Sequence, residues 1–201
     1  AVFAVPIISA STLQAFFPEL PIACLGIVLA FMNVYVYSLK VHVSVDMLTG
    51  IANRHKLMNE LEDKISSLKK DEKLYFLFLD IDSFKQINDA FGHHEGDNAL
   101  KSVATVLKTL CKTTGGFCAR YGGDEFAVIQ VLKKSGDIKR IKKNIYDSVE
   151  KITDKNSAYS LSVSIGCAQH TSETESVQEL ISRADSNMYS KKMQRKEKVK
   201  L

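Results

Sequence analysis

The first 39 residues of this 201-residue chain almost completely lack charge: they hold no lysine or arginine, and Glu19 is their single acid. All 27 basic residues lie from Lys40 onward, together with 22 of the 23 acids, so this part carries a net charge of +5. The excess is spread along the sequence and does not form the concentrated basic stretch of a nucleic-acid groove. We therefore expect no nucleic-acid partner, whereas an anionic ligand or a lipid surface suits the modest positive charge.

The sequence also lacks paired cysteines. Its four cysteines, at positions 24, 111, 118 and 167, show no C-x-x-C spacing, and its five histidines are scattered without a zinc-ligand spacing. Neither a disulfide framework nor a structural zinc site is predicted. We interpret the cysteines as reduced thiols in a cytosolic domain.

Residues 20–39 form a long apolar segment in which Asn33 is the exception. As a helix, about 20 residues match a hydrocarbon thickness of about 30 Å. Tyr35 lies near the far end, and Lys40 follows directly, which places the C-terminal side in the cytoplasm. We predict a transmembrane helix here, with residues 1–45 forming the membrane segment and connector of an inner-membrane protein. The alternative is a buried helix of a soluble sensor domain.

Residues 46–201 have the pattern of one further domain. Apolar residues recur at helical spacing over 57–68, 99–110, 138–152 and 177–188, and a Ser-x-x-Glu capping box precedes the last of these. Residues 74–79 are a continuous apolar run of strand length, and residues 160–167 alternate as a half-buried strand does. This order predicts an α+β fold, in which a central, mostly antiparallel sheet is flanked by helices.

The stretch 120–126 reads Arg-Tyr-Gly-Gly-Asp-Glu-Phe and predicts a tight β-hairpin with acid at its tip. Without a Cβ, Gly122 and Gly123 can adopt φ > 0 and let a base or a phosphate lie against the backbone. Asp124 and Glu125 are then available to bind a cation.

Asp80 follows the apolar run 74–79, at the C-terminal end of the predicted buried strand. A carboxylate in that position needs a partner such as a metal ion or a base. If the strand lies beside the hairpin, Asp80 and Asp124 face each other across one sheet edge and can share divalent ions. Hard oxygen ligands of this kind suit Mg²⁺.

Three motifs together resemble the GGDEF family, the diguanylate cyclases. Residues 46–54 match D-x-L-T-G-x-x-N-R, residues 80–97 match D-x-D-x-F-K-x-I-N-D-x-x-G-H-x-x-G-D, and residues 120–126 hold the hairpin motif. The resemblance implies a fold like the polymerase palm and the nucleotidyl cyclase core. It also implies a homodimer, formed through the catalytic domain and the membrane segment, that condenses two GTP into cyclic di-GMP and two pyrophosphates. Two Mg²⁺ ions per active site are expected.

The resemblance implies roles for individual residues. Asp80, the carbonyl of Ile81 and Asp124 would bind the metals, and Glu125 would add a ligand or help to deprotonate the attacking hydroxyl. Asn88 and Asp97 would bind the edge of the guanine base. The residues expected to contact the rest of the nucleotide are Ser83, Phe84, Lys85, Gly122, Gly123, Lys192 and Lys196.

Two positions depart from the family pattern. Where the family has K-x-x-G-R-N, this chain has Lys196 in place of the arginine, which keeps the charge but loses the bidentate fork and weakens the expected phosphate affinity. An R-x-x-D product-binding motif is replaced by Thr-Thr-Gly-Gly at residues 113–116. We therefore predict no feedback inhibition through that site.

Other functions were weighed against the cyclase. A membrane-tethered module that binds GTP without turnover would fit the altered region around Lys196. A cyclase that accepts ATP is disfavoured by Asp97, because a carboxylate suits the donors of guanine and not the N1 acceptor of adenine. A membrane scaffold without a ligand leaves Asp80 and Asp124 unexplained.

Overall fold

A computed structural model describes residues 9–10, 12–19, 22–42, 44–133, 137–153, 159–171 and 175–199. For the helical residues 23, 37–42, 153 and 194–199, the structure describes the backbone and not the side chains. The chain divides into two compact units, Ala1–Ser44 and Val45–Leu201, and each is described by itself.

In the first unit, α2 (Ile22–His42) is a helix of 21 residues that includes most of the predicted segment 20–39. Its apolar run is interrupted by Asn33, whose side-chain amide donates to the Leu29 carbonyl over 2.8 Å. Among the described residues, no helix combines the length and the apolar character needed to cross a membrane. The helical conformation is thus present, but the predicted transmembrane span is not supported.

The second unit is built on a four-stranded sheet. Its strands are β1 (Lys73–Ile81), β2 (Phe117–Gly122), β3 (Glu125–Leu132) and β4 (Val163–Gln169). They lie in the order β2-β3-β1-β4, and each neighbouring pair is antiparallel. The predicted antiparallel sheet is confirmed, and β1 lies inside it, with a partner on each side.

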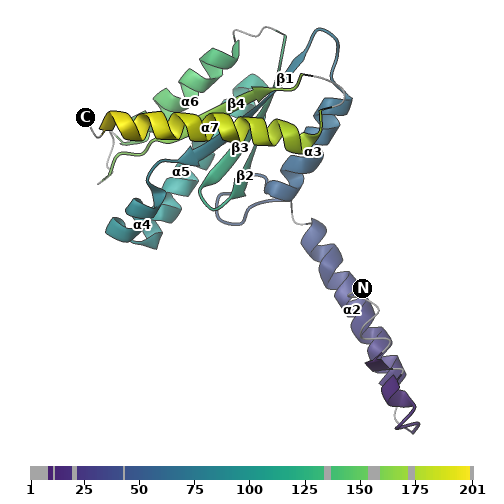
Figure 1. Cartoon of the computed structure of the whole chain (residues 1–201). Helices are drawn as coiled ribbons and strands as arrows, with labels where there is room; N and C mark the ends of the chain where they lie inside the picture. Colours follow the sequence, from purple (N-terminus) through teal and green to yellow (C-terminus); the bar gives the residue numbers. More distant parts are fainter. Residues whose placement is uncertain are drawn as a thin grey trace. The chain divides into compact units, whose positions relative to one another are not determined.

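Helices cover both faces of this sheet (Figure 1). They are α3 (Arg54–Ser66), α5 (His93–Thr114), α6 (Asp137–Thr153) and α7 (Val177–Val199), whereas the short helix α4 (Phe84–Phe91) packs on α5. Alternate residues of β1 point to opposite faces. Leu77 and Leu79 pack with α5 and α6, whereas Phe76 and Phe78 pack with α3 and α7. The continuous apolar run of β1 is thus explained by burial on both sides.

The start of α7 has the predicted capping box. The backbone N–H of Ser176 donates to the Glu179 carboxylate over 2.8 Å, and the N–H of Glu179 donates to the Ser176 hydroxyl over 3.2 Å. Helix α4 was not predicted. Its apolar residues Phe84, Ile87 and Phe91 recur at helical spacing, but this stripe covers only eight residues, fewer than the about 11 to 18 over which periodicity is read reliably.

Candidate active site

Three carboxylates lie at neighbouring backbone positions where β1 ends beside the β2–β3 hairpin. Asp80, the penultimate residue of β1, lies directly opposite Glu125, the first residue of β3. Asp124 precedes Glu125 in the turn, and its carbonyl accepts a hydrogen bond of 3.2 Å from the N–H of Ile81. The antiparallel register therefore brings the pair Asp80 and Ile81 beside the pair Asp124 and Glu125, which lie 43 to 45 positions further along the sequence.

The surroundings of these carboxylates disfavour negative charge. Asp80 is only 8% exposed, and burial raises its pKa, with a further rise from the charge of Asp124, against the lowering effect of Lys192. Burial likewise raises the pKa of Glu125, and Asp124, Asp80 and Asp185 add to the rise. A cation bound at this edge would relieve the repulsion among the carboxylates.

One cation from the chain lies at this edge. Lys192 extends from α7, and its Nζ donates to Oδ1 of Asp80 over 2.5 Å. Burial alone would lower the pKa of Lys192, but the hydrogen bond to Asp80 and the charges of Asp80 and Asp124 raise it above its ordinary value. Lys192 is therefore positively charged at neutral pH. The side chain of Lys196 falls outside the described residues.

A close approach of α7 to β4 carries Lys192 to this position. A Cβ added to Gly166 of β4 would lie 1.9 Å from the carbonyl oxygen of Ala184 and 2.4 Å from the backbone nitrogen of Met188. Met188 precedes Lys192 by about one helical turn. The missing side chain at Gly166 thus lets the helix lie close enough for Lys192 to reach Asp80.

The hairpin turn is held by an ion pair from a distant segment. Nε and Nη2 of Arg120 donate to the carbonyl of Gly123 over 3.0 and 2.7 Å, while Nη1 lies 3.2 Å from each carboxylate oxygen of Asp46. Gly123 has a φ of 38°, whereas Gly122 ends β2 without a positive φ. Only one of the two glycines therefore uses the left-handed region. Arg120 connects this turn to the first residue of the 46–54 motif.

Asp82 is anchored beside the site. Its two carboxylate oxygens accept hydrogen bonds from Ser162 over 2.8 Å and from Ser164 over 2.6 Å. The N–H of Asp82 donates to the carbonyl of Ser162 over 2.9 Å. These bonds tie the loop after β1 to the start of β4, so the chain direction after Ile81 is well defined.

The loop after β1 turns into the N-terminus of α4 at Ser83. This residue has φ 57° and ψ 27°, a left-handed conformation that non-glycine residues rarely adopt. The helix then begins at Phe84, where backbone N–H groups without helical partners favour an anion. Lys85 lies in the same turn and is exposed. Ser83, Phe84 and Lys85, all assigned to phosphate binding from the sequence, thus share one helix terminus.

The residues assigned to the guanine edge come from a pair of packed helices, α4 and α5. Asn88 lies on α4 and Asp97 lies in the second turn of α5. The Asn88 side chain lies against Gly96, because a Cβ there would be 1.9 Å from its Oδ1. Gly96 therefore leaves space for Asn88 beside the residue that precedes Asp97. The side chains of Asn88 and Asp97 are both half-buried.

The donor atoms at the sheet edge fit a hard divalent cation. Asp80, Asp124 and Glu125 supply carboxylate oxygens, and Ile81 supplies a backbone carbonyl. In the described part of the chain, no three His, Cys, Asp or Glu side chains converge closely enough to hold one metal ion. Mg²⁺ commonly takes one or two carboxylates and completes its shell with water and substrate phosphates. The residues present fit that mode of binding.

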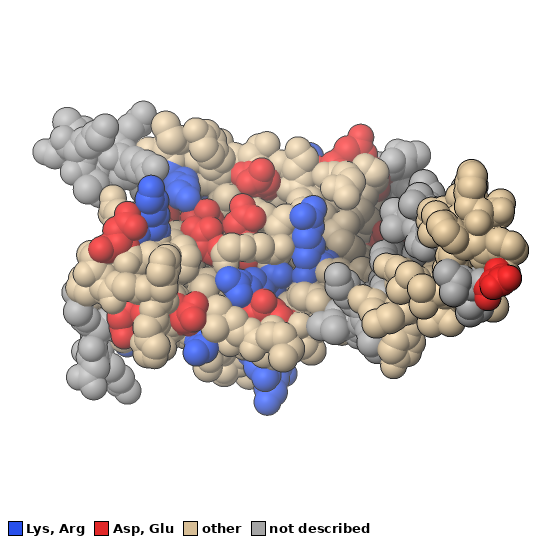
Figure 2. Space-filling view, turned by 90° about the horizontal axis from the view of Figure 1, so that it is seen from below, with Lys and Arg blue, Asp and Glu red and all other residues tan. Residues whose placement is uncertain are grey.

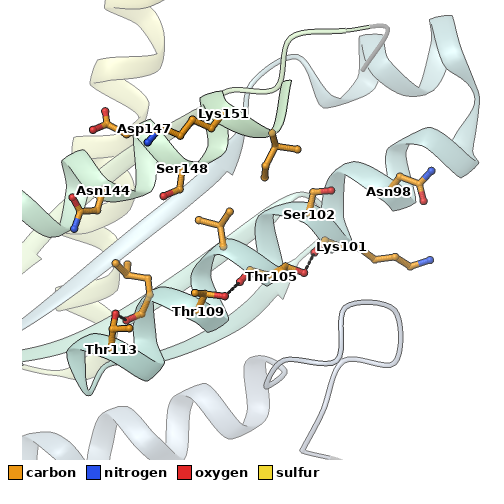
Figure 3. Close-up of a pocket in the computed structure, with 13 residues that line it drawn as sticks. Asn98, Lys101, Ser102, Thr105, Thr109, Thr113, Asn144, Asp147, Ser148 and Lys151 are labelled. Carbon is orange, nitrogen blue, oxygen red and sulfur yellow. Dashed lines mark hydrogen bonds between the residues drawn. The ribbon is translucent and has the colours of Figure 1, made fainter. Parts of the chain in front are cut away.

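Acidic and basic side chains lie next to one another over the face shown in Figure 2. A separate cavity of about 740 Å³ lies between α5 and α6, where Ser102, Thr105 and Ser148 point into it (Figure 3). The Thr105 hydroxyl donates to the carbonyl of Lys101 over 2.8 Å. Among the described residues, none of those predicted to bind nucleotide or metal lines this cavity.

Sequence reasoning assigned no role to Arg120, Asp46, Asp82 or Gly166. Arg120, Asp46 and Asp82 lie within the three family motifs, and their place in these motifs was the sequence feature that could have indicated a role. Their contacts join segments up to 82 residues apart, as for Asp82 with Ser164, and sequence spacing does not reveal such pairs. For Gly166, no signal other than its place in a strand was present.

The chain is similar in sequence to curated diguanylate cyclases. Diguanylate cyclase A of Treponema denticola is 33% identical over 162 residues, covering 78% of this chain and 43% of that protein. Diguanylate cyclase VdcA of Vibrio cholerae is 33% identical over 152 residues, covering 73% of this chain and 43% of that protein. The chain therefore spans less than half the length of these two curated relatives.

A solved structure has the same fold. The GGDEF domain of DgcB from Caulobacter crescentus, in complex with c-di-GMP, superimposes with a TM-score of 0.68 and 29% identity, covering 75% of this chain and 91% of that chain. Residues 43–198 match the family described as "Diguanylate cyclase, GGDEF domain". With this match over most of its length, the chain belongs to the GGDEF-domain family of diguanylate cyclases.

Proposed function

We propose that this chain condenses two GTP molecules into cyclic di-GMP and releases two pyrophosphates. The observation that carries the proposal is the register of β1 and β3, which sets Asp80 opposite Glu125 and beside Asp124. This edge concentrates carboxylates whose charge needs a cation, and it lies next to a helix terminus suited to phosphate. The combination is what transfer of a nucleotidyl group requires.

We infer that Asp80, the carbonyl of Ile81 and Asp124 hold Mg²⁺, two ions per active site. When bound, these ions neutralise charge on the α-phosphate and lower the pKa of the attacking 3′-hydroxyl. Glu125 lies next to Asp124, and its raised pKa favours accepting a proton from that hydroxyl. Asp80 and Asp124 hold their positions through the hydrogen-bonded ends of β1 and the hairpin.

The remaining residues bind the nucleotide. Asn88 and Asp97 contact the guanine edge, where the Asp97 carboxylate accepts from N1 and N2 donors. Lys85 and Lys192 contact the β- and γ-phosphates together with the N–H groups of Ser83 and Phe84. The sequence alone assigns Lys196 to the phosphates, because its side chain falls outside the described residues. Gly122 and Gly123 allow the nucleotide to approach the hairpin backbone.

The reaction joins two nucleotides, and one domain binds one of them, so the active form is a homodimer in which two sites face each other. The exposed apolar residues of α2, such as Leu25, Phe31 and Met32, offer a surface for pairing of the first units. Specific activity should therefore rise with protein concentration. Activity that stays constant on dilution into a monomeric range, measured by sedimentation, would contradict the dimer.

The direct test is to incubate the purified chain with GTP and Mg²⁺ and to measure cyclic di-GMP and pyrophosphate. Asp124→Asn should lower the rate by at least about 10²-fold, whereas Asp71→Asn, at an exposed carboxylate, should leave it unchanged. If the chain binds GTP but makes no product, the non-catalytic GTP-binding module is the better function. An unimpaired Asp124→Asn variant would contradict the assigned site.

We also propose, as the sequence predicted, that the protein acts at the inner membrane with its catalytic domain in the cytoplasm. The proposal rests on the apolar composition of residues 20–39 and the basic residues that follow. Fractionation of cells that produce the chain tests it. Recovery of the protein entirely outside the membrane fraction would contradict this location.

A further inference from the structure

Two of the four cysteines lie on one face of the sheet, close to the catalytic hairpin. Cys111 is in the last turn of α5, and Cys118 is the second residue of β2. Both are buried, with 7% and 9% exposure, and both belong to the apolar cluster beneath α5 and α6. The strand neighbours of Cys118, Phe117 and Ala119, pack on the opposite face. Strand alternation therefore points the Cys118 side chain toward α5.

The two thiols are close enough to influence each other's ionisation, and the effect on the pKa has opposite directions for the two. The hydrogen bond with Cys118 raises the pKa of Cys111, and burial adds to the rise. The same hydrogen bond lowers the pKa of Cys118, and the positive charge of Lys108 lowers it further, while burial opposes both effects. Of the two sulfurs, Cys118 is therefore the one whose ionised form is favoured. The thiolate is the nucleophilic form of cysteine, and the positive charge of a nearby lysine favours it.

We propose that Cys111 and Cys118 are a redox-sensitive pair, which a peroxide converts reversibly into a disulfide at the base of the β2–β3 hairpin. The other two cysteines are placed differently. Cys167 lies on β4, at the opposite edge of the sheet from β2. Cys24 belongs to the first unit and is exposed. Cys167 packs against the same apolar cluster, but two strands, β3 and β1, separate β4 from β2.

The chemistry balances with hydrogen peroxide as the two-electron oxidant. The Cys118 thiolate attacks one peroxide oxygen, the O–O bond breaks, and hydroxide leaves to yield the sulfenic acid. The Cys111 sulfur then attacks the Cys118 sulfur, the S–O bond breaks, and the departing hydroxide takes the Cys111 proton and leaves as water. Two thiols are oxidised to one disulfide, and one peroxide is reduced to two waters.

The backbone between the two cysteines permits the bond. The segment turns at Gly115, which has a φ of 71°, and this turn brings the end of α5 back alongside β2. The sulfur atoms must approach to about 2.05 Å. The last turn of a helix frays most easily, so Cys111 is on the part of α5 best able to make this movement.

Trypsin separates the two cysteines and makes the product easy to identify. Cleavage after Lys108, Lys112 and Arg120 places Cys111 in the peptide 109–112 and Cys118 in the peptide 113–120. The full chain is reduced, treated with increasing hydrogen peroxide, alkylated and digested. We expect the two peptides to appear joined by a disulfide, with at least a tenfold excess over any peptide pair that includes Cys24 or Cys167. Dithiothreitol should restore two separate peptides.

Variants separate this pair from general oxidation. Cys111→Ser should abolish the joined peptides and leave Cys118 as a sulfenic acid that dimedone labels, whereas Cys24→Ser should leave the joined peptides unchanged. The wild-type mapping needs no variant, so the test holds even if Cys111→Ser folds poorly. Recovery of Cys111 and Cys118 as separately alkylated peptides, after peroxide has oxidised other cysteines, would overturn the proposal.

Discussion

Replacing Gly166 with alanine tests how the packing of α7 on the sheet supports the active site. The added Cβ would lie 1.9 Å from the carbonyl oxygen of Ala184, about 1.5 Å closer than the 3.4 Å of an ordinary contact. It would also lie 2.4 Å from the backbone nitrogen of Met188. Both atoms belong to the backbone of α7, so no side-chain rotation relieves the overlap, and the helix must move away from β4.

The cost of such overpacking is typically about 1–3 kcal/mol. For a unit of this size, each kcal/mol lowers the melting temperature by about 2–4 °C, so we expect a decrease of about 2–12 °C. Because Lys192 follows Met188 by one turn, its Nζ also moves away from Asp80. Weaker phosphate binding should then raise the KM for GTP by up to about tenfold, or about 1.4 kcal/mol.

Thermal and urea denaturation followed by circular dichroism measure the first effect, and initial rates over a range of GTP concentrations measure the second. Cys167→Ala is the matched control, because this neighbour on β4 packs with the cluster on the opposite face of the sheet. A Gly166→Ala variant with the wild-type urea midpoint and the wild-type KM would refute the reasoning.

Four further outcomes are expected. Glu125→Gln should lower kcat by about 10²- to 10⁴-fold and raise the urea midpoint at pH 7, because burial raises the pKa of this carboxyl in the folded state. The higher urea midpoint of Glu125→Gln should disappear as the pH falls, because the wild-type carboxyl is then protonated and neutral as well. A Glu125→Gln variant that is less stable than wild type at pH 7 would contradict this reasoning. Asp46→Asn should destabilise the protein by about 1.5–3 kcal/mol at pH 7. Burial raises the pKa of Asp46, but the hydrogen bonds from Thr49 and Arg120 outweigh it and lower the pKa below 3.8. The difference in stability between wild type and variant should therefore shrink as the pH falls through and below 3.8. A stability difference that does not change with pH would contradict this prediction. Gly96→Ala should displace Asn88 and weaken GTP binding by about three- to tenfold, measured by calorimetry; unchanged affinity would exclude Asn88 from the base site. Cyclic di-GMP should not inhibit through residues 113–116, and strong inhibition of initial rates at low micromolar product would contradict that prediction.

The sequence by itself determined the local structure of the second unit. Apolar periodicity depends on residues within one or two turns, and it located β1, α3, α5, α6 and α7. The turn at Gly122 and Gly123 and the capping box before α7 were also evident, because each motif satisfies its backbone groups within a few residues. The same signal did not identify α4, because its apolar stripe of Phe84, Ile87 and Phe91 covers only eight residues, fewer than the about 11 to 18 over which periodicity is read reliably. It also suggested a transmembrane span that α2 does not support.

Only the tertiary structure decided which of these residues touch. The ion pair of Arg120 with Asp46 spans 74 residues, and that of Lys192 with Asp80 spans 112. Both depend on the strand order β2-β3-β1-β4 and on the close approach of α7 at Gly166, which no pattern within one element specifies. Motifs could therefore indicate which residues carry the chemistry. The arrangement of carboxylates, lysine and helix terminus at one sheet edge arises because the antiparallel pairing and helix packing that bury the core also fix those side chains in space.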